Sequence, residues 1–433
     1  MILKSLYNRF LNSKGVSTDT RVLKPDSLFF ALRGPHFNGN DFAKKALDMG
    51  ANGVVVDDPD LVKLGPKIIV VENSLQTLQN LARHHRKKLN IPVIALTGSN
   101  GKTTTKELIR SVLSRKYNVG ATEGNLNNTI GVPLTLLKLN RKHELAIIEM
   151  GANHSKEIQF LSDIALPNWG YITNFGKAHL EGFGSLEGVI QAKSELYQHL
   201  IQNHQNILVN ANDPIQIRQT KGYPTTTFGS DKSNDFQIQY DKHTENGLKL
   251  YFQNSIIQNP LYGGYNLPNI AAALAFGAIY NIPISASQKA IASYQSSNNR
   301  SQKIKIKNST LILDAYNANP TSMQAALNSF SKKASSKSAL ILGDMMELGT
   351  VASEEHEALL DLCLQTKIGF IFTIGSQFKS TKRKDPRIEK FDNCQAFRTQ
   401  MKNKKIDFDI LLIKGSRSMQ LEDLIPFFKT QIQ

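Results

Sequence analysis

The strongest chemical signal in the sequence is a short glycine-rich segment between an apolar stretch and an amphipathic one. Residues 93–96 predict a buried strand, and residues 101–116 carry apolar side chains at helical spacing. The polar and glycine residues at this junction are Gly98, Ser99, Asn100, Gly101, Lys102, Thr103 and Thr104. Glycines let backbone N–H groups turn towards phosphate oxygens, and the start of a helix adds partial positive charge. We therefore expect a nucleotide here, with Lys102 at the β/γ-phosphates and the Thr103 hydroxyl on Mg²⁺.

The spacing of this loop differs from the usual phosphate-loop pattern GxxxxGK[ST]. Leu96 occupies the position of the first glycine, so the segment is a shorter GxxGK[ST] form. A GKT triplet alone is common by chance. The order of strand, turn and helix around it is what favours a phosphate site over a merely structural turn.

Two further residues could hold a metal ion beside the phosphates. Glu149 ends the apolar segment 145–150, and ligands gather at the carboxyl edge of parallel strands. An acidic residue at that place can also be a simple strand terminus, which is the alternative. His179 follows another apolar segment in a glycine-containing loop. A lone histidine is usually a surface or satisfied residue, so only its neighbours single it out.

The pattern of apolar runs predicts the fold that must position these groups. Short runs typical of buried strands occur at 67–71, 91–96, 145–150, 206–210, 310–314, 338–344, 369–375 and 409–415. Several are separated by segments of helical spacing, which argues for βαβ units and parallel sheets. We therefore expect an α/β protein. The polar, weakly alternating segment 231–260 predicts a hairpin instead.

Length and charge narrow the class of protein. The 433 residues suggest two to four domains at roughly 100–200 residues each. A net charge of +16 raises the question of a nucleic-acid or membrane-surface partner. The basic run at 377–390 carries no nucleic-acid-binding signature and reads as a solvated face.

The sequence also predicts a compartment. No apolar run approaches the length of a membrane span, and the N-terminus does not read as a signal peptide. The two cysteines, Cys363 and Cys394, form no CxxC pair, which fits a reducing environment. We expect a cytoplasmic protein without a membrane span.

Several motifs resemble the Mur ligases of bacterial cell-wall synthesis. They are TGSNGKTTT (97–105), ATEGNLNNTIGVPLTLL (121–137), EMGAN (149–153), NFGKAHLEGFGSLEGVIQAKSELY (174–197), DAYNANPTSM (314–323), LGDMMELG (342–349) and IKGSRSMQLE (413–422). Segment 314–323 is the most specific, and it favours the branch of the family that adds D-alanyl-D-alanine. Segment 17–58 resembles a UDP-sugar domain. The resemblance covers nearly the whole chain.

The resemblance implies three domains and a defined reaction. We expect a UDP-sugar-binding domain at 1–88, a central ATPase with a mainly parallel sheet at 89–298, and a Rossmann-like domain at 299–433. ATP would phosphorylate the carboxylate of UDP-N-acetylmuramoyl-tripeptide to an acyl phosphate, which the amine of D-alanyl-D-alanine would attack. The implied cofactors are ATP, two Mg²⁺ ions and a carbamylated lysine at Lys193. We expect a monomer with no nucleic-acid partner.

The resemblance also implies roles residue by residue. The catalytic residues would be Lys102, His179, Lys193 and Arg300. The ATP contacts would be residues 98–104 together with Asn266, Asn269, Arg300 and Asp314. The metal ligands would be Thr103, Glu149, His179 and Lys193. The substrate contacts would be Ser17, Asp19, Arg21, Asn125, Asn127, Asn128, Asn317, Asn319, Lys414 and Arg417.

Two kinds of alternative stay open at this point. Within the class, the chain could be another Mur ligase or a folylpolyglutamate synthase, although the folate enzyme lacks a domain that matches 17–58. From a different class, a phosphate-loop ATPase that binds nucleic acid would account for the basic ends of the chain.

Overall fold

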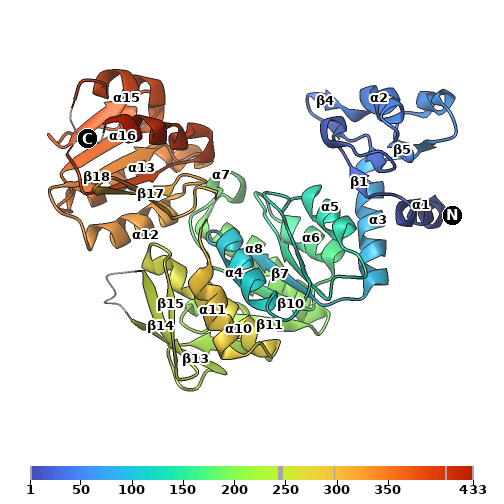
Figure 1. The fold of residues 1–433 in the computed structure, drawn as a ribbon, viewed down its shortest axis with the longest axis horizontal. Coiled ribbons are helices and arrows are strands. Elements are labelled where there is room, and N and C mark those ends of the chain that lie inside the picture. Colours follow the sequence, from blue (N-terminus) through green and yellow to red (C-terminus); the bar gives the residue numbers. More distant parts are fainter. Residues whose placement is uncertain (1, 242–246, 297, 405–406, 432–433) are drawn as a thin grey trace.

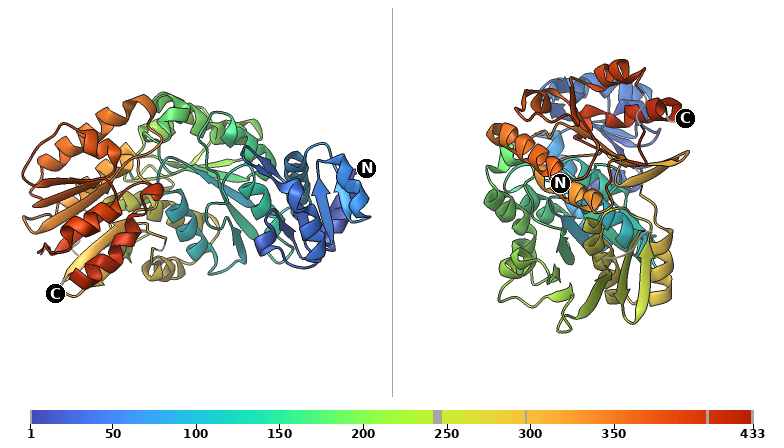
Figure 2. Two further views of the ribbon diagram at one scale, coloured as in Figure 1. Left: turned by 90° about the horizontal axis from the view of Figure 1, so that it is seen from above. Right: turned by 90° about the vertical axis from the view of Figure 1, so that its left-hand side faces the viewer.

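The computed structural model describes residues 2–241, 247–296, 298–404 and 407–431. Three α/β units follow one another in space as they do along the chain (Figure 1). The middle unit lies between the other two, so the N-terminal and C-terminal units stand at opposite ends (Figure 2, left). Among the described residues, no helix is long and apolar enough to cross a membrane. The predicted α/β class with three units is confirmed.

The first unit contains a four-stranded parallel sheet in the order β1–β2–β5–β6. Its strands are β1 (Val16–Ser17), β2 (Leu28–Phe30), β5 (Gly53–Val56) and β6 (Ile68–Val70), with an antiparallel pair β3 (Arg33–Gly34) and β4 (Phe37–Asn38) beside it. Its helices are α1 (Ile2–Leu11), α2 (Ala43–Asp48) and α3 (Ser74–Leu89). Phe29 and Phe30 enter different apolar clusters, because successive strand residues point to opposite faces.

The middle unit is built on a nine-stranded sheet in the order β15–β14–β13–β12–β11–β10–β7–β9–β8. Its strands are β7 (Val93–Thr97), β8 (Val119–Ala121), β9 (Leu145–Glu149), β10 (Trp169–Ile172), β11 (Asn206–Asn210), β12 (Thr226–Gly229), β13 (Phe236–Asp241), β14 (Leu248–Phe252) and β15 (Ser255–Asn259). All pairs are parallel except β13–β14 and β14–β15, which are antiparallel.

Helices cover both faces of this sheet. They are α4 (Lys102–Leu113), α5 (Gly131–Lys138), α6 (Glu157–Ala165), α7 (Leu180–Phe183), α8 (Leu186–Gln202), α9 (Pro214–Gln219), α10 (Leu267–Ile279) and α11 (Ile284–Ser293). Ile94 and Leu96 pack with α4 and α10, whereas Val93 and Ala95 pack on the α5, α6 and α8 side. The central strands are therefore buried on both faces, which explains their unbroken apolar sequence.

The third unit has a six-stranded sheet in the order β16–β17–β21–β18–β19–β20, antiparallel only between β16 and β17. Its strands are β16 (Gln302–Ile306), β17 (Ser309–Asp314), β18 (Ser338–Gly343), β19 (Phe370–Ile374), β20 (Ile388–Phe391) and β21 (Ile410–Lys414). Its helices are α12 (Pro320–Ser331), α13 (Ala352–Leu364), α14 (Ser376–Ser380), α15 (Cys394–Met401) and α16 (Ile425–Gln431).

All eight predicted apolar strands are present, as β6, β7, β9, β11, β17, β18, β19 and β21. Their ends differ from the predicted ranges by at most two residues. The hairpin predicted over 231–260 is confirmed by the antiparallel pairing of β13, β14 and β15. The domain boundaries at 88/89 and 298/299 stay predictions.

Candidate active site

A cavity of about 880 Å³ lies between the middle and third units. Its lining includes the residues that end or follow five parallel strands of the two sheets, namely Ser99, Glu149, Asn210, Asp314 and Lys414. Ligands of open α/β sheets bind at this carboxyl edge. The cavity is therefore where both sheets would present a shared ligand.

The glycine-rich loop forms one end of the cavity. Gly98 and Gly101 have φ angles of +140° and +80°, which side chains other than hydrogen rarely allow. A Cβ on Gly98 would lie 2.0 Å from Oγ1 of Thr173. Lys102, the first residue of α4, donates to the Gly98 carbonyl at 2.7 Å. The loop thus has the open backbone and the helix start that the sequence predicts for a phosphate site.

The segment after β10, residues 173–176, holds the glycine-rich loop through hydrogen bonds. Ser99 donates through Oγ to the Gly176 carbonyl at 2.9 Å, and the backbone N–H of Asn100 donates to Oδ1 of Asn174 at 3.0 Å. Asn174 also donates through Nδ2 to the Asn100 carbonyl at 2.9 Å. These bonds fix the loop conformation before any ligand binds, so little ordering is needed on binding.

Glu149 lies at the end of β9 beside the start of α4. Oε1 of Glu149 accepts from Oγ1 of Thr103 at 3.2 Å and from Nδ2 of Asn127 at 2.9 Å. Its other oxygen, Oε2, is buried and has no hydrogen-bond partner. A buried carboxylate oxygen without a donor is costly unless a cation or a water satisfies it.

These donors fit Mg²⁺, which prefers oxygen ligands and keeps several waters or substrate oxygens. The unsatisfied Oε2 of Glu149 and the hydroxyl of Thr103 would hold the ion. Within the described residues, no group of three or more His, Cys, Asp or Glu side chains could hold a metal. The chain alone therefore offers a partial coordination shell, as expected for an ion shared with phosphates.

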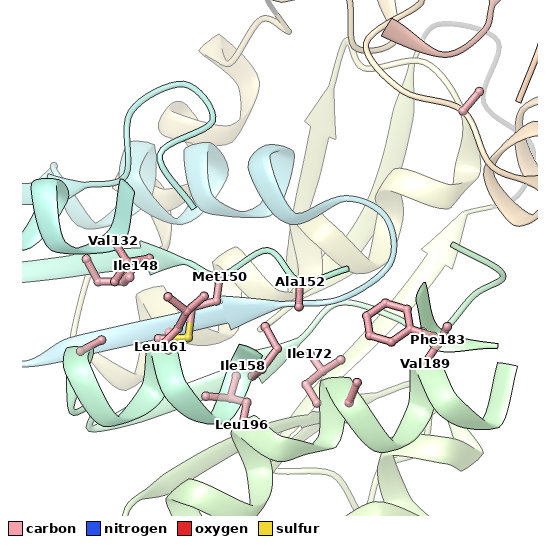
Figure 3. Packing of buried hydrophobic residues seen from close by; sticks show 14 of the residues in the cluster. Val132, Ile148, Met150, Ala152, Ile158, Leu161, Ile172, Phe183, Val189 and Leu196 are labelled. Atoms are coloured by element: carbon pink, nitrogen blue, oxygen red, sulfur yellow. The ribbon is translucent and has the colours of Figure 1, made fainter. Parts of the chain in front are cut away.

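Lys193 is buried on α8, with a side chain that is 1% exposed. Its Nζ donates to the Ala152 carbonyl at 3.0 Å and lies 5.0 Å from the centre of the Phe183 ring. Figure 3 shows the apolar side chains of Ala152, Phe183 and Val189 in this region. Burial, with a smaller effect of the Lys102 charge, lowers the pKa of Lys193 to about 7. Near neutral pH, the Lys193 amine is thus uncharged in a substantial fraction of the protein molecules.

His179 joins the middle unit to the third unit. It has a left-handed backbone with φ +52°, and its Nδ1 lies 2.5 Å from Oε2 of Glu347. Glu347 comes from the turn after β18 and also lines the cavity. The contact with His179 lowers the pKa of Glu347 below its usual value, although Nδ1 of His179 does not meet hydrogen-bond geometry and has no other hydrogen-bond partner among the described residues.

A chain of amides connects α4 to the start of α10. Thr105 donates through Oγ1 to Oδ1 of Asn269 at 3.0 Å, and Nδ2 of Asn269 donates to Oδ1 of Asn266 at 2.9 Å. Asn266 in turn donates to the Tyr262 carbonyl at 2.8 Å. Both asparagines line the cavity beside the phosphate loop, where the resemblance expects ATP contacts.

The third unit contributes an ion pair at the ends of two neighbouring strands. Nζ of Lys414 lies 2.7 Å from Oδ2 of Asp314, and the Lys414 side chain is 3% exposed. Lys414 also donates to the Asn317 carbonyl at 3.4 Å. The second oxygen of Asp314 accepts from the backbone N–H of Ser301 at 3.0 Å.

Asn319 reaches across to the phosphate loop. It caps the N-terminus of α12 with its side chain, and its Nδ2 donates to Oδ1 of Asn100 at 2.8 Å. Asn319 is absent from the cavity lining, so its direct effect is to hold the two units together.

Arg300 stands in the connection between the middle and third units. Asn298, Asn299 and Ser301 around it all have left-handed φ angles, between +48° and +59°. The guanidinium carbon lies 3.5 Å from the centre of the Tyr316 ring, and Nε is buried without a hydrogen-bond partner. Arg300 lines the cavity, and its unpartnered Nε is a donor suited to a phosphate oxygen.

Most of the predicted site residues lie together on the cavity. Those that line it are Ser99, Asn100, Gly101, Lys102, Thr103, Thr104, Asn125, Asn127, Asn128, Glu149, His179, Asn266, Asn269, Arg300, Asp314, Asn317 and Lys414. Gly98, Lys193 and Asn319 contact lining residues without lining the cavity themselves.

Four other predicted residues lie elsewhere. Ser17, Asp19 and Arg21 belong to the first unit, where the exposed Arg21 pairs with Asp19 at 2.7 Å. Arg417 is exposed and pairs with Glu422. Neither group is part of the cavity lining, and their roles stay predictions.

Sequence reasoning missed several residues of the site. Lys106 is 1% exposed, and its Nζ lies 4.0 Å from Oε2 of Glu149. Its place one turn after Lys102 was a signal, since residues four apart share a helix face. Tyr316 and Glu347 stand inside motifs that carried the resemblance, but nothing in their spacing indicates the cavity.

The fold and the cavity define a phosphate-binding α/β enzyme that works between two units. Family models match the chain in three consecutive parts. "Mur ligase family, catalytic domain" matches residues 12–98, "Mur ligase middle domain" matches 96–277, and "Mur ligase, glutamate ligase domain" matches 299–417.

Similar proteins agree with these matches. A Bacillus subtilis protein named UDP-N-acetylmuramoyl-tripeptide–D-alanyl-D-alanine ligase is 35% identical over 430 residues, or 95% of this chain and 92% of that protein. The structure of MurF from Acinetobacter baumannii has a TM-score of 0.87 at 28% identity, covering 99% of this chain and 98% of that one. MurF from Thermotoga maritima in complex with ADP has a TM-score of 0.84 at 26% identity, covering 98% of each chain. The chain belongs to the Mur ligase family, and it is an ATP-dependent ligase.

Proposed function

We propose that the protein joins D-alanyl-D-alanine to UDP-N-acetylmuramoyl-tripeptide, with cleavage of ATP to ADP and phosphate, in peptidoglycan precursor synthesis. The observation that carries the proposal is the cavity between the middle and third units. One side presents the phosphate loop and Glu149, and the other presents Asp314, Asn317 and Lys414. Two relatives that match 95% of this chain are named as ligases for these two substrates.

The residue types match the chemistry of the reaction. A peptide carboxylate is a poor electrophile until one of its oxygens takes the γ-phosphoryl group of ATP and ADP leaves. The dipeptide amine then attacks the acyl carbon, and phosphate departs with the shared oxygen. Lys102 and Arg300 would stabilise the negative charge on the phosphoryl oxygens during transfer. A metal held by Glu149 and Thr103 would supply positive charge that stabilises the phosphoryl oxygens during transfer.

The remaining lining residues would position the three substrates. Asn266 and Asn269 would contact ATP beside the loop, and Asn125, Asn127 and Asn128 would meet the muramoyl peptide. Asn317 and Lys414 of the third unit would bind the dipeptide. Arg417 would contribute positive charge from outside the cavity. Asp314 would orient Lys414 through their 2.7 Å ion pair. Asn319 would fix the position of the third unit relative to the phosphate loop through its hydrogen bond to Asn100.

The first unit would hold the uridine diphosphate through Ser17, Asp19 and Arg21. We take residues 1–88, 89–298 and 299–433 as the three domains and the monomer as the working form, in the cytoplasm. The folate-ligase alternative accounts for the middle and third units but gives no role to the first.

Lys193 would act as a carbamate. Its neutral amine would form an N–C bond with CO₂ and release a proton to water, which replaces a potential cation by an anion. Burial supports this step, because a pKa lowered to about 7 leaves a substantial fraction of the amine uncharged near neutral pH. The carbamate would then join His179 in holding a second Mg²⁺.

Phosphate release from ATP tests the function directly. We expect release only when UDP-N-acetylmuramoyl-tripeptide and D-alanyl-D-alanine are both present. Release with the UDP-muramoyl substrate and a single amino acid would instead show another Mur ligase, and release with a folate and glutamate would show the folate enzyme. Salt-sensitive retention on DNA or RNA, without release that depends on both substrates, would favour the nucleic-acid-binding ATPase.

A further inference from the structure

The incoming dipeptide needs an acidic side chain in the cavity to bind its ammonium group, and no residue has yet been given that role. This inference rests on the proposed function. D-alanyl-D-alanine carries an ammonium group at the end that reacts and a carboxylate at the other. Lys414 can receive the carboxylate, but the ammonium needs an acidic partner close to the phosphate end of the cavity.

Five acidic side chains line the cavity, and most already have fixed partners in their own unit. They are Glu149, Glu157, Asp213, Asp314 and Glu347. Glu149 accepts from Thr103 and Asn127, and Asp314 is paired with Lys414.

Two more of these acids serve the backbone. Glu157 accepts from the N–H groups of Asn153 and His154 at 2.7 and 3.0 Å. Asp213 caps the start of α9. Carboxylates that satisfy helix and turn N–H groups are poorly placed to bind a ligand as well.

Glu347 differs from these four. Within the part of the chain that the structure describes, its carboxylate has one polar partner, Nδ1 of His179 at 2.5 Å, which belongs to the opposite unit. The Glu347 side chain is 49% exposed, so a ligand in the cavity can reach it.

The turn that carries Glu347 is held firmly. Glu347 has a left-handed backbone with φ +62°. The preceding N–H, of Met346, donates to Oγ of Ser416 at 2.9 Å, and the N–H of Met345 donates to Nε2 of His356 at 3.0 Å. The Glu347 carbonyl accepts from the N–H of Glu181 at 3.2 Å. A non-glycine residue keeps this conformation only when its surroundings impose it, so the carboxylate is presented from a fixed position.

That position lies towards the phosphate loop. His179 follows the segment 173–176, which holds the loop through Ser99 and Asn100. Glu347, His179 and the loop residues line the same cavity, and the acyl phosphate would form at the end that the loop lines.

We infer that Glu347 binds the ammonium group of the incoming dipeptide and holds its nitrogen beside the acyl carbon. The nitrogen attacks as the neutral amine, after one of its protons has passed to water. Nδ1 of His179 lies close to this carboxylate but makes no hydrogen bond with it, so the carboxylate can still accept a donor. An ammonium offers N–H donors together with a full positive charge. Glu347 is thus a specificity residue for an amine substrate, contributed by the third unit.

The test is the Glu347→Gln variant, measured as phosphate release with each substrate varied in turn. Gln keeps the shape and loses the charge. We expect the KM for D-alanyl-D-alanine to rise roughly 10- to 100-fold, since a charged hydrogen bond is lost. The KM for ATP and for the UDP-muramoyl substrate should stay within about twofold. Glu347→Asp should recover part of the dipeptide affinity.

Glu355→Gln is the matched control. Glu355 pairs with Lys177 at 2.5 Å, so it also links the third unit to the middle unit. It lines a neighbouring pocket and not the catalytic cavity. If Glu347 only held the units together, both variants would raise all three KM values to a similar extent, and that result would overturn the inference.

A ligand change supplies the second arm. Propanoyl-D-alanine is the dipeptide without its amino group, and we expect it to bind wild type more weakly than the dipeptide. In Glu347→Gln that difference should vanish. An unchanged difference, or a variant that alters only the Mg²⁺ requirement, would contradict the inference. If wild type shows no dipeptide-dependent release, the proposed function fails; if it does and the variant keeps its dipeptide KM, only this inference fails.

Discussion

The two sides of the catalytic cavity hold their polar and charged side chains in different ways. On the side of the middle unit, Lys102, Glu149 and Lys106 find their partners within the same unit. On the side of the third unit, Glu347 pairs with His179 and Asn319 pairs with Asn100, so partners lie across the cavity. Lys102, Glu149 and Lys106 are thus partnered within the middle unit, as Asp314 and Lys414 are within the third. Glu347 depends instead on a contact between the units.

This difference corresponds to the two halves of the reaction. Phosphoryl transfer needs fixed positive charge around the phosphates, and reorganising such charge during the reaction would be costly. The acceptor amine arrives later, so its site can be assembled when the units close. Variants on the two sides should therefore fail in different ways.

Lys102→Met should cause the largest loss. Lys102 is held at the loop by the Gly98 carbonyl, and its removal takes away the positive charge beside the phosphates. We expect phosphate release at saturating substrates to fall by roughly 10³-fold or more. The thermal unfolding midpoint should change little, since the side chain lies at the cavity. A loss smaller than tenfold would contradict the view that the middle side supplies the fixed charge.

Lys193→Met should follow, with a loss of roughly 10²-fold or more if the carbamate holds a metal. Wild type depleted of CO₂ should lose activity and regain it with bicarbonate, whereas the variant should not respond. Methionine keeps most of the packing near Phe183 and Ala152. An active Lys193→Met enzyme would remove the carbamate from the mechanism.

The same residue gives a stability test against pH in CO₂-free buffer. The pKa of Lys193 is lowered from 10.5 to about 7, so the unfolded chain binds more protons than the folded one between these values. The free energy of unfolding of wild type should therefore gain a rising contribution as pH increases from about 7 towards 10. Lys193→Met should lack that contribution. Identical slopes in chemical denaturation would contradict the burial of a neutral amine.

Lys414→Met tests the third side through stability. It would leave Asp314 without its cation, which we expect to cost about 2–3 kcal/mol, at the low end for a buried pair because Asp314 faces the cavity. The double variant Asp314→Asn/Lys414→Met should recover most of that loss in urea denaturation, while phosphate release stays impaired. A double variant no more stable than Lys414→Met would show that the pair is not the cause.

Arg417→Ala should have the smallest effect. Arg417 is exposed, pairs with Glu422 and does not line the cavity, and an exposed ion pair is worth less than about 1 kcal/mol. We expect each KM to change by less than about threefold. A larger rise in the dipeptide KM alone would extend the third side of the site to the segment after β21.

The middle side of the cavity was largely predictable from sequence. Its parts lie close together along the chain, because strand, loop and helix of 93–113 form one unit with a recognisable period. Glu149 followed from the rule that parallel strands present ligands at their carboxyl edge. The strands could be predicted because strands buried on both faces of a sheet have unbroken apolar sequences.

The contacts between the units were not predictable in the same way. Asn100 and Asn319 are 219 positions apart, and no local pattern indicates that their side chains meet. Asn319 was named through the family resemblance, and Glu347 was not named at all. Spacing along the chain reports on one element and its neighbours, whereas such contacts depend on how two sheets are placed in space.

The connection at 298–301 restricts the length of the chain between the middle and third units, beyond what the folding of either unit requires. Arg300 lies inside this connection, between residues with left-handed backbones. It lines the cavity, and its buried Nε has no hydrogen-bond partner within the described part of the chain. One inserted residue adds up to about 3.3–3.6 Å of chain, more than a hydrogen bond tolerates. Surface loops usually accept insertions and deletions freely. Here a change of length would displace the guanidinium from the phosphates, so this linker should resist indels even where both flanking domains still fold.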